Sequence, residues 1–324
     1  MKAVRVEKQG GPEVLELVDV EPIGAPGPGQ AVVRVKAAGV NFMDVGQRRG
    51  SYPRQAPFTL GVEGAGVVES VGEGVRSVKP SDRVAFTGVP GAYSEAVLAD
   101  AERLIPLPDE FTFEQGAAFP LQGMTAHYLI NEFRRPVPGS VVLIQAAAGG
   151  MGGLLVQWAK HLGATVIGTV STEAKARAAR TSGADHVFIY TEQDFVAETN
   201  RITHGRGADL IIDGVGRTTF KGDLEAAAIR GHIVIFGAAS GPGDPVSPNA
   251  LMPKALTVSG GSLQNFLRTP EELMRRANDV IAGIRAGWLN LNIGHVLPLA
   301  QAAAAHELLE TRKTEGELVL SIAL

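Results

Sequence analysis

Two patterns of hydrophobic residues divide the chain. Up to about residue 120, short β-branched runs such as residues 31–35 and 67–71 are separated by clusters of glycine and proline such as residues 22–29. Short apolar runs between turn residues are typical of an irregular β-rich domain. Helical spacing is scarce until residues 112–129, where Pro120 predicts a kink or a restart of the helix.

From residue 141 onwards, apolar runs of strand length alternate with segments that have helical spacing. Two of these segments end at Gly163 and Gly183, as helices commonly do. The alternation predicts a parallel, doubly wound sheet. The predicted strands are residues 141–146, 164–170, 185–189, 208–213, 231–236 and 255–259, and the predicted helices are residues 150–163, 172–183, 192–203 and 217–229.

The last part of the chain is expected to return to the first domain. Helical segments at residues 270–286 and 300–310 and a short segment at residues 293–299 precede a final strand at residues 318–322. A β-rich domain with an open edge must be completed by another segment. The sequence therefore predicts an α/β protein: residues 1–122 form most of the β-rich domain, 123–264 the doubly wound domain, and 265–324 the return.

Composition excludes several classes of protein. A length of 324 residues with 45% hydrophobic content favours two folded domains. The net charge of −4, with both signs interspersed, argues against a nucleic-acid partner. We expect a cytoplasmic protein without a membrane span, because the sequence shows no signal-like leader and no 18-residue apolar run. Zero cysteines and seven histidines without helical metal-ligand spacing predict no metal site.

A glycine-rich turn joins the first strand and the first helix of the second domain. Residues 147–152 read AAGGMG, which matches the dinucleotide fingerprint GxGxxG except that Ala147 replaces the first glycine. Gly149, Gly150 and Gly152 allow a pyrophosphate to approach the backbone at the helix N-terminus. A turn without a ligand is the competing interpretation, but the strand before the turn and the helix after it favour a dinucleotide.

The end of the next strand indicates which dinucleotide binds. An NAD-binding protein would place Asp or Glu here for the ribose hydroxyls, whereas this chain has Ser171, with Lys175 four residues later. A 2′-phosphate held by both side chains would gain a charge-assisted contact of about 1.5–3 kcal/mol. The sequence therefore favours NADPH over NADH, with Lys175 as an ordinary solvated residue the alternative.

Polar and glycine-containing segments elsewhere are candidates for the rest of the site. Gly214, Val215, Phe236 and Gly237 follow two further strands, where ligands of such sheets bind, although sharp turns alone would also explain the glycines.

In the first domain, residues 37–44 read AAGVNFMD, so Asn41 and Asp44 follow an apolar strand, where a loop facing a site would begin. The amide of Asn41 and the phenol of Tyr52 suit a carbonyl or quinone oxygen that gains charge as a hydride arrives. A turn-stabilising asparagine and an ordinary half-buried tyrosine are the alternatives.

These motifs resemble those of the zinc-independent medium-chain dehydrogenases/reductases of the quinone oxidoreductase (zeta-crystallin-like) family. The likeness runs nearly end to end and rests on residues 37–44, GVEGAGVVESVGEGV at 61–75, LQGMTAHYL at 121–129, QAAAGGMGGLLVQWAKHLGATVIGTV at 145–170 and DGVG at 213–216. The resemblance implies a GroES-like catalytic domain interrupted in sequence by a six-stranded Rossmann domain, with the active site in the cleft between them.

The resemblance also assigns residues by position. It places Gly150, Met151 and Gly152 along the pyrophosphate and puts Ser171, Lys175 and Tyr190 around the adenosine phosphate. The residues that it places on the substrate or nicotinamide side are Asn41, Asp44, Tyr52, Thr125, Phe236, Gly237, Ser262 and Leu263.

Zinc-dependent relatives carry Cys, His and Cys at the positions of Asn41, Val62 and Leu121. An amide and two aliphatic side chains cannot bind zinc, so the resemblance implies an acceptor that is already electrophilic, such as a quinone or an enone.

We therefore expect an enzyme that transfers hydride from NADPH to a quinone or an activated α,β-unsaturated carbonyl, with Asn41 bonded to the acceptor oxygen and Tyr52 as proton donor. The close alternative is an enoyl-thioester or alkenal reductase, for which Arg48, Arg49 and Arg54 would form a basic surface for coenzyme A. A non-catalytic NADPH-binding or RNA-associated protein is the less favoured alternative, because the acidic charge argues against RNA and the polar cluster at residues 41–52 argues for catalysis. The resemblance also implies a homodimer formed through the edge strand near residues 255–259.

Overall fold

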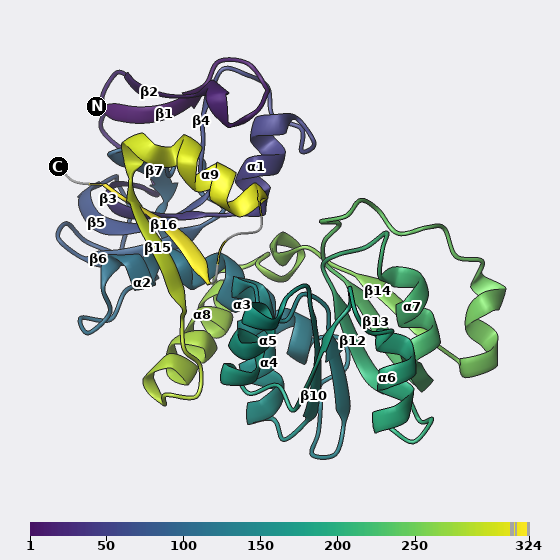
Figure 1. Cartoon of the computed structure of the whole chain (residues 1–324). Coiled ribbons are helices and arrows are strands. Elements are labelled where there is room, and N and C mark those ends of the chain that lie inside the picture. The colour runs from purple at the N-terminus through teal and green to yellow at the C-terminus, as the bar shows by residue number, and fades with distance from the viewer. Residues whose placement is uncertain (312–313, 315, 323–324) are drawn as a thin grey trace. The chain divides into compact units, whose positions relative to one another are not determined.

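The computed structural model describes residues 1–311, 314 and 316–322. The chain forms two compact units, which are described separately (Figure 1). The first unit contains Met1–Leu121, Thr269–Ala277 and Leu291–Leu324, and the second contains Gln122–Arg268 and Asn278–Asn290. Residues 278–290 thus lie in the second unit, although the sequence-based division placed them in the returning tail.

The first unit is built on two β-sheets. The smaller, antiparallel sheet has the order β2-β1-β4, and the larger sheet has the order β15-β16-β3-β5-β6-β8, with β7 also paired to β3. The strands are β1 (Lys2–Val6), β2 (Leu15–Asp19), β3 (Gln30–Val40), β4 (Phe58–Thr59), β5 (Glu63–Val71), β6 (Arg83–Thr87), β7 (Ala96–Asp100), β8 (Ile105–Pro106), β15 (Ile293–Pro298) and β16 (Glu317–Ser321).

The core of the first unit joins both ends of the chain. Val33 and Val35 on β3 are fully buried in one hydrophobic cluster with Leu318 and Leu320 on β16. β16 pairs antiparallel with β3, Leu318 opposite Val40. The C-terminal strand therefore covers the edge of β3 that would otherwise be left open.

Helices and 3-10 turns complete this unit. The predicted break at Pro120 is confirmed, because α2 ends at Ala118 and α3 begins at Pro120. These elements are α1 (Phe42–Arg49), α2 (Phe113–Ala118), the start of α3 (Pro120–Asn131), part of α8 (Pro270–Arg285), α9 (Ala302–Glu310), η1 (Pro12–Val14), η2 (Ala101–Arg103) and η5 (Leu299–Gln301).

Helix α1 corrects the sequence-based prediction, which placed a loop after residue 40. Its eight residues are too few and too polar to show a clear helical period. The ends of the helix are nevertheless encoded. Asn41 and Asp44 form a reciprocal capping box, and Gly50 ends the helix in the left-handed region at φ 82°.

The second unit confirms the predicted doubly wound architecture. Its six strands are all parallel, in the order β11-β10-β9-β12-β13-β14. Helices α4 and α5 lie on one side of the sheet and α6 on the other (Figure 1). The strands are β9 (Val141–Ile144), β10 (Thr165–Val170), β11 (His186–Ile189), β12 (Ala208–Asp213), β13 (Ala227–Ile235) and β14 (Thr257–Gly260). The helical elements are most of α3, α4 (Gly150–His161), α5 (Glu173–Thr181), α6 (Phe195–Ile202), α7 (Phe220–Ala226), η3 (Pro248–Lys254) and η4 (Leu263–Phe266).

The end of one predicted helix in this unit was wrong. The helix predicted over residues 217–229 ends at Ala226, and β13 begins at Ala227. Alanine favours helices, but Ala227 pairs with Ala208 of β12 and is 2% exposed. Strand pairing and burial therefore override the local helical preference.

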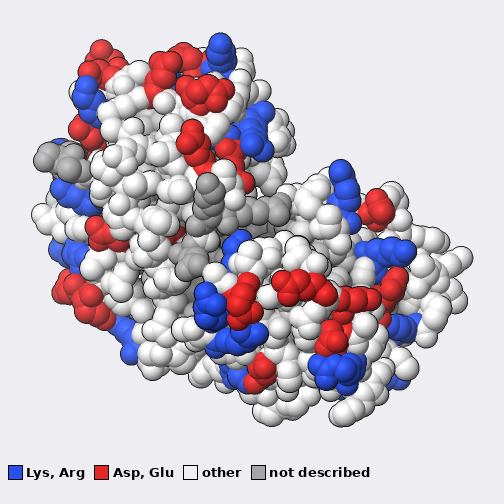
Figure 2. All heavy atoms as spheres, in the orientation of Figure 1, with Lys and Arg blue, Asp and Glu red and all other residues white. Residues whose placement is uncertain are grey.

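On the face of the molecule drawn in Figure 2, acidic and basic side chains are interspersed, as they are along the sequence. Within the described ranges, no helix combines the length and apolar character needed to span a bilayer.

Candidate active site

The glycine-rich turn lies where a pyrophosphate would bind. It follows β9, and Gly149 is the extended N-cap residue of α4, with φ −74° and ψ 171°. Within the described chain, no side chain caps this helix N-terminus, which is the arrangement found at helix N-termini that bind anions. A Cβ on Gly152 would lie 2.3 Å from the carbonyl oxygen of Ala146, so the turn requires glycine there. The arrangement fits a dinucleotide.

The three residues proposed for the adenosine phosphate lie at neighbouring strand ends. Ser171 directly follows β10, and Tyr190 directly follows β11. The amide of Tyr190 donates to the carbonyl of Val170 over 3.0 Å, which holds the two strand ends side by side. Lys175 lies in the N-terminal half of α5, where its amide donates to the hydroxyl of the N-cap Thr172.

The segments proposed for the nicotinamide side also pack together. The amide of Phe236 donates to the carbonyl of Asp213 over 3.0 Å. A Cβ on Gly214 would lie 2.7 Å from the Phe236 ring, and one on Gly237 would lie 2.8 Å from the carbonyl oxygen of Gly214. The two loops therefore approach so closely that both positions need glycine. Val215 lies in the first of these loops, Ser262 is the N-cap residue of η4, Leu263 begins η4 with its side chain buried, and Thr125 lies buried on α3.

In the first unit, Asn41 and Asp44 lie at the N-terminus of α1 and are almost fully buried. The backbone N–H of Asn41 donates to Asp44 Oδ2 over 2.8 Å, and the side-chain Nδ2 of Asn41 donates to Glu63 Oε2 over 2.7 Å. Glu63 also accepts the amide of Leu121 over 2.6 Å. Glu63, which sequence reasoning missed, thus connects β5, α1 and the start of α3.

Burial changes the acidity of this cluster. Desolvation raises the pKa of Asp44 to about 7, although hydrogen bonds from Asn41 and Tyr93 oppose the shift. Desolvation also raises the pKa of Glu63 to about 8. Glu317 is 3% exposed, and neither of its carboxyl oxygens has a hydrogen-bond partner among the described residues. Burial and the nearby Glu63 raise the pKa of Glu317 as well.

A chain of contacts links Asp44 to α9. The hydroxyl of Tyr93 lies 3.3 Å from both Asp44 Oδ2 and His306 Nε2, and Arg48 Nη1 lies 3.2 Å from His306 Nδ1. Burial lowers the pKa of His306 to about 3, with a contribution from the Arg48 charge, so the imidazole is neutral near pH 7.

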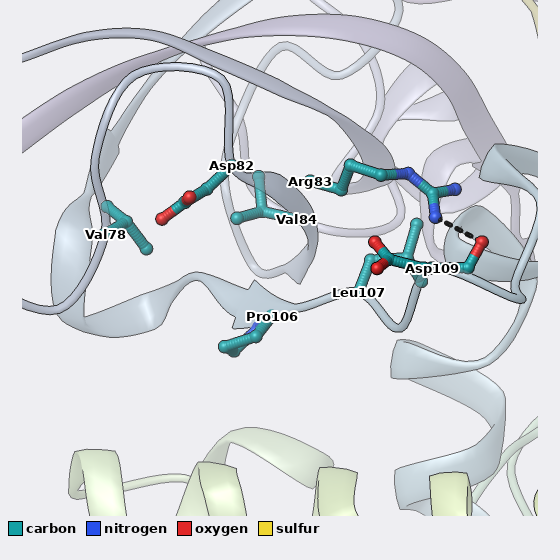
Figure 3. A pocket seen from close by; sticks show the side chains of 7 residues that line it. All are labelled: Val78, Asp82, Arg83, Val84, Pro106, Leu107 and Asp109. Carbon is teal, nitrogen blue, oxygen red and sulfur yellow. Dashed lines mark hydrogen bonds between the residues drawn. The ribbon is translucent and has the colours of Figure 1, made fainter.

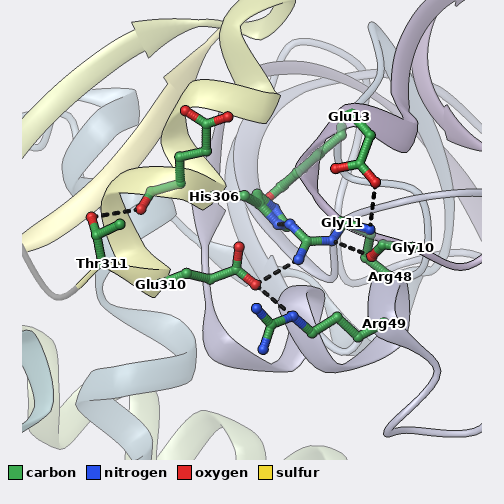
Figure 4. Close-up of polar contacts among 10 residues, drawn as sticks. Gly10, Gly11, Glu13, Arg48, Arg49, His306, Glu310 and Thr311 are labelled. Atoms are coloured by element: carbon green, nitrogen blue, oxygen red, sulfur yellow. Dashed lines mark hydrogen bonds and ion pairs between the residues drawn. The ribbon is translucent and has the colours of Figure 1, made fainter.

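Arg48 does not form part of a solvent-facing basic surface. Its side chain is 0% exposed and is bound by Glu310 Oε1 at 2.5 Å and by the carbonyl of Gly10 (Figure 4). Arg49 contacts the same Glu310 oxygen at 2.8 Å, and Arg54 donates to Gln47. The expected basic surface for coenzyme A is therefore wrong for Arg48 and weakened for the other two arginines.

Tyr52 lies apart from the buried cluster. Its residue is 53% exposed, and its ring lies against α1 at Gly46, where a Cβ would be 2.1 Å from Tyr52 Cδ2. The amide of Tyr52 also donates to the carbonyl of Gly46 over 3.1 Å. No hydrogen bond among the described residues links its hydroxyl to Asn41 or Asp44.

A pocket of about 260 Å³ beside β6 and β8 is a separate feature (Figure 3). Arg83 lines this pocket, but its guanidinium group donates to the carbonyls of Pro108, Asp109 and Phe111. Asp82, which also lines the pocket, pairs with Lys79. In the described part of the chain, no group of three or more His, Cys, Asp or Glu side chains is arranged to hold a metal.

Two family models match the chain. The model of the alcohol dehydrogenase GroES-like domain matches residues 27–109, and the model named zinc-binding dehydrogenase matches residues 150–279. The positions at which the family resemblance places the ligands of zinc-dependent relatives, Asn41, Val62 and Leu121, lie outside the second match and carry no side chain typical of a zinc site.

Known relatives match over almost the full length. The chain is 41% identical to a quinone oxidoreductase of Pseudomonas aeruginosa, covering 98% of this chain and 99% of the relative. It is 39% identical to a 2-haloacrylate reductase of Burkholderia, covering 98% of each. A crystal structure of the Escherichia coli quinone oxidoreductase complexed with NADPH superimposes with a TM-score of 0.95 at 39% identity, covering 99% of this chain and 100% of that one. The chain belongs to the quinone oxidoreductase family of medium-chain dehydrogenases/reductases.

Proposed function

We propose that this chain is an NADPH-dependent oxidoreductase that reduces a quinone or an activated α,β-unsaturated carbonyl compound. The observation that carries the proposal is the carboxyl edge of the six-stranded sheet. At this edge the N-terminus of α4 lies near the end of β10. The residue after β10 is Ser171 rather than Asp or Glu, and Lys175 follows four residues later on α5. The relative crystallised with NADPH supports the same cofactor.

The second unit would bind the cofactor through four sets of residues. The amides at Gly149–Gly152 would hold the pyrophosphate, Ser171, Lys175 and Tyr190 the 2′-phosphate, and the loops at Gly214 and Gly237 the nicotinamide half. Thr125, Ser262 and Leu263 would complete the nicotinamide side. Bound NADPH supplies a hydride from its reduced ring.

The first unit would bind the acceptor. The carboxamide of Asn41 would donate an N–H to the acceptor oxygen, on which charge develops as the hydride arrives. Glu63 would fix the orientation of this carboxamide by accepting from Asn41 Nδ2, and Asp44 would hold the backbone of Asn41 by accepting its backbone N–H. Tyr52, with its exposed ring, would donate the proton that completes the reduction.

A reductase of electron-poor alkenes is the second candidate. It is favoured by the likeness to a 2-haloacrylate reductase, whose named substrate has a carbon–carbon double bond conjugated to a carboxyl group. The coenzyme A thioester version of this candidate is less supported, because Arg48 is buried in an ion pair.

The test is to follow the absorbance of NADPH with a panel of quinones, enones, 2-haloacrylates and enoyl thioesters. We expect turnover of quinones or small electron-poor alkenes, with NADPH preferred to NADH, and quinone products analysed for one- or two-electron reduction. Tight NADPH binding with turnover of none of these acceptors would favour a non-catalytic NADPH-binding protein.

We also propose a homodimer through β14, in the cytoplasm. β14 is the edge strand of the six-stranded sheet, and Val258 on it is 36% exposed. Ile229 on the adjacent β13 and Met252 on η3 are 73% and 72% exposed. A solution mass of one chain would contradict the dimer, and Val258→Lys should dissociate it because like charges would face each other across a two-fold axis.

A further inference from the structure

A buried polar network lies beneath the carboxyl ends of the central strands of the second unit. Gln145 directly follows β9, and Thr169 lies near the end of the neighbouring β10. Thr169 Oγ1 donates to Gln145 Oε1 over 2.5 Å, and Gln145 Nε2 donates to Asp223 Oδ1 over 2.6 Å. All three residues are at most 3% exposed.

Asp213, the last residue of β12, holds the loop that follows it. Its Oδ1 accepts the amides of Val215 and Gly216 over 2.6 and 3.2 Å, and its Oδ2 accepts the hydroxyl of Thr219 over 2.8 Å. Gly216 lies at φ 87°, in the left-handed region. The carboxylate of Asp213 therefore sets the conformation of residues 214–216.

The second oxygen of Asp223 has no donor among the described residues, although Asp223 is 0% exposed. Burial is the main cause that raises the pKa of Asp223 well above its ordinary value, and the charge of Asp213 and a hydrogen bond to it raise the pKa further. Two carboxylates in contact cannot both remain charged. Asp223 is therefore the neutral partner, and its O–H donates to Asp213.

We propose that Asp223 is a positioning residue for NADPH, because its buried side chain joins Gln145, next to the glycine-rich turn, to Asp213, which holds the loop at residues 214–216. β9 and β12 are adjacent in the sheet, and in this strand order the crevice between them is where dinucleotides bind. The inference rests on the cofactor named in the proposed function, and it adds two residues, Gln145 and Asp223, to which the sequence motifs assign no role.

The test compares two substitutions of Asp223 in the purified full-length protein, with the dissociation constant of NADPH measured from the fluorescence of the bound cofactor. Asp223→Asn keeps an N–H donor for Asp213 and an oxygen for Gln145, so we expect a dissociation constant within about twofold of the wild type. Asp223→Ala removes both bonds and should raise the dissociation constant about tenfold or more. The kcat at saturating NADPH should stay within about twofold in both variants.

Asp209→Ala is the matched control for a purely structural effect. Asp209 lies near the opposite end of β12, where its carboxyl group accepts the amide of Val141 over 2.8 Å and pairs with Arg206. Its loss should lower the melting temperature without changing the dissociation constant of NADPH.

Two binding results would overturn the proposal: an unchanged dissociation constant in Asp223→Ala, or equal weakening by Asp223→Asn and Asp223→Ala. A wild-type chain that bound no NADPH would overturn the proposed function and this inference together.

If Asp223→Ala does not fold, infrared difference spectra of wild type and Asp223→Asn at pH 7 decide the same point. We expect the carbonyl band of a protonated carboxyl group in the wild type that Asp223→Asn lacks. The absence of this band from the wild type would overturn the proposal, because an ionised Asp223 cannot donate a hydrogen bond to Asp213.

Discussion

Asn41 donates a side-chain N–H to the carboxyl group of Glu63, with 2.7 Å between Nδ2 and Oε2. The other oxygen of Glu63 accepts the amide of Leu121. The family resemblance places two zinc ligands of other relatives at positions 41 and 121. In this chain a buried carboxyl group joins these two positions through hydrogen bonds, which gives α1 and the start of α3 a fixed relation to β5.

Glu63→Gln should destabilise the protein. A carboxyl group can accept both N–H groups, whereas a carboxamide offers one oxygen and turns an N–H toward the second donor. One buried donor is then left unpaired, at a cost of about 1–3 kcal/mol. Urea unfolding measures the change. The control is Glu69→Gln on the same strand, whose exposed pair with Arg34 should contribute less than about 1 kcal/mol. Equal effects of the two substitutions would contradict the role of Glu63.

Asp44 should make stability depend on pH near neutrality. In the unfolded chain Asp44 ionises near pH 4, but in the folded chain its pKa is raised to about 7, mainly by burial. The folded state therefore binds more protons between these values, and its stability falls as the pH rises through this window.

Comparison with Asp44→Asn isolates this effect, because the opposing contribution of His306 is common to both proteins. The free energy of unfolding of the wild type minus that of the variant should fall between pH 4 and pH 7 by an amount on the order of 3–4 kcal/mol. A flat difference across this range would show that Asp44 is ionised normally in the folded protein.

Arg48 and Arg49 should contribute very differently to stability although both contact Glu310. Arg48 is 0% exposed and also contacts His306 and the carbonyl of Gly10, whereas the Arg49 side chain is 56% exposed. Arg48→Met breaks a buried pair and should cost about 3 kcal/mol or more, and Arg49→Met should cost less than about 1 kcal/mol. Chemical denaturation of both variants checks the ranking, and equal losses would argue against it.

The parts of the fold that follow from local pattern could be predicted. The alternation after residue 141 encodes the parallel sheet, and the glycine-rich turn at Gly149 lies within one strand–turn–helix segment, so a short window of sequence contains the whole feature. Ser171 and Tyr190 come together because adjacent parallel strands end at the same edge.

The buried polar network of the first unit could not be predicted in this way. Asn41 and Glu63 are 22 residues apart and meet only through the pairing of β3 with β5, and Arg48 and His306 are 258 residues apart. A single sequence does not specify such pairings. Helix α1 was missed because its eight residues are too few to show a helical period, although the residues of its capping box, Asn41 and Asp44, are present in the sequence.

Gly46 should control the position of Tyr52. A Cβ at residue 46 would lie 2.1 Å from Tyr52 Cδ2, so Gly46→Ala must displace the ring. If Tyr52 donates the proton, Gly46→Ala and Tyr52→Phe should each lower kcat by roughly 10²–10⁴-fold, the usual contribution of a general acid. The double variant should then be no slower than Tyr52→Phe alone, because both changes remove the same group. Multiplying effects, or a Tyr52→Phe enzyme with normal kcat, would assign the proton to another donor.

Lys175 should determine the preference for NADPH. Lys175 lies in the N-terminal half of α5, four residues after Ser171 at the end of β10, and its contact with a 2′-phosphate would be charge-assisted. Loss of about 1.5–3 kcal/mol in Lys175→Ala should raise the KM for NADPH roughly 10- to 100-fold while the KM for NADH, which has a hydroxyl group there, changes little. Arg177→Ala, two residues along the same helix and exposed, is the matched control for a general change of surface charge. Because the two cofactors differ only at this phosphate, equal changes in both KM values would show that Lys175 does not contact it.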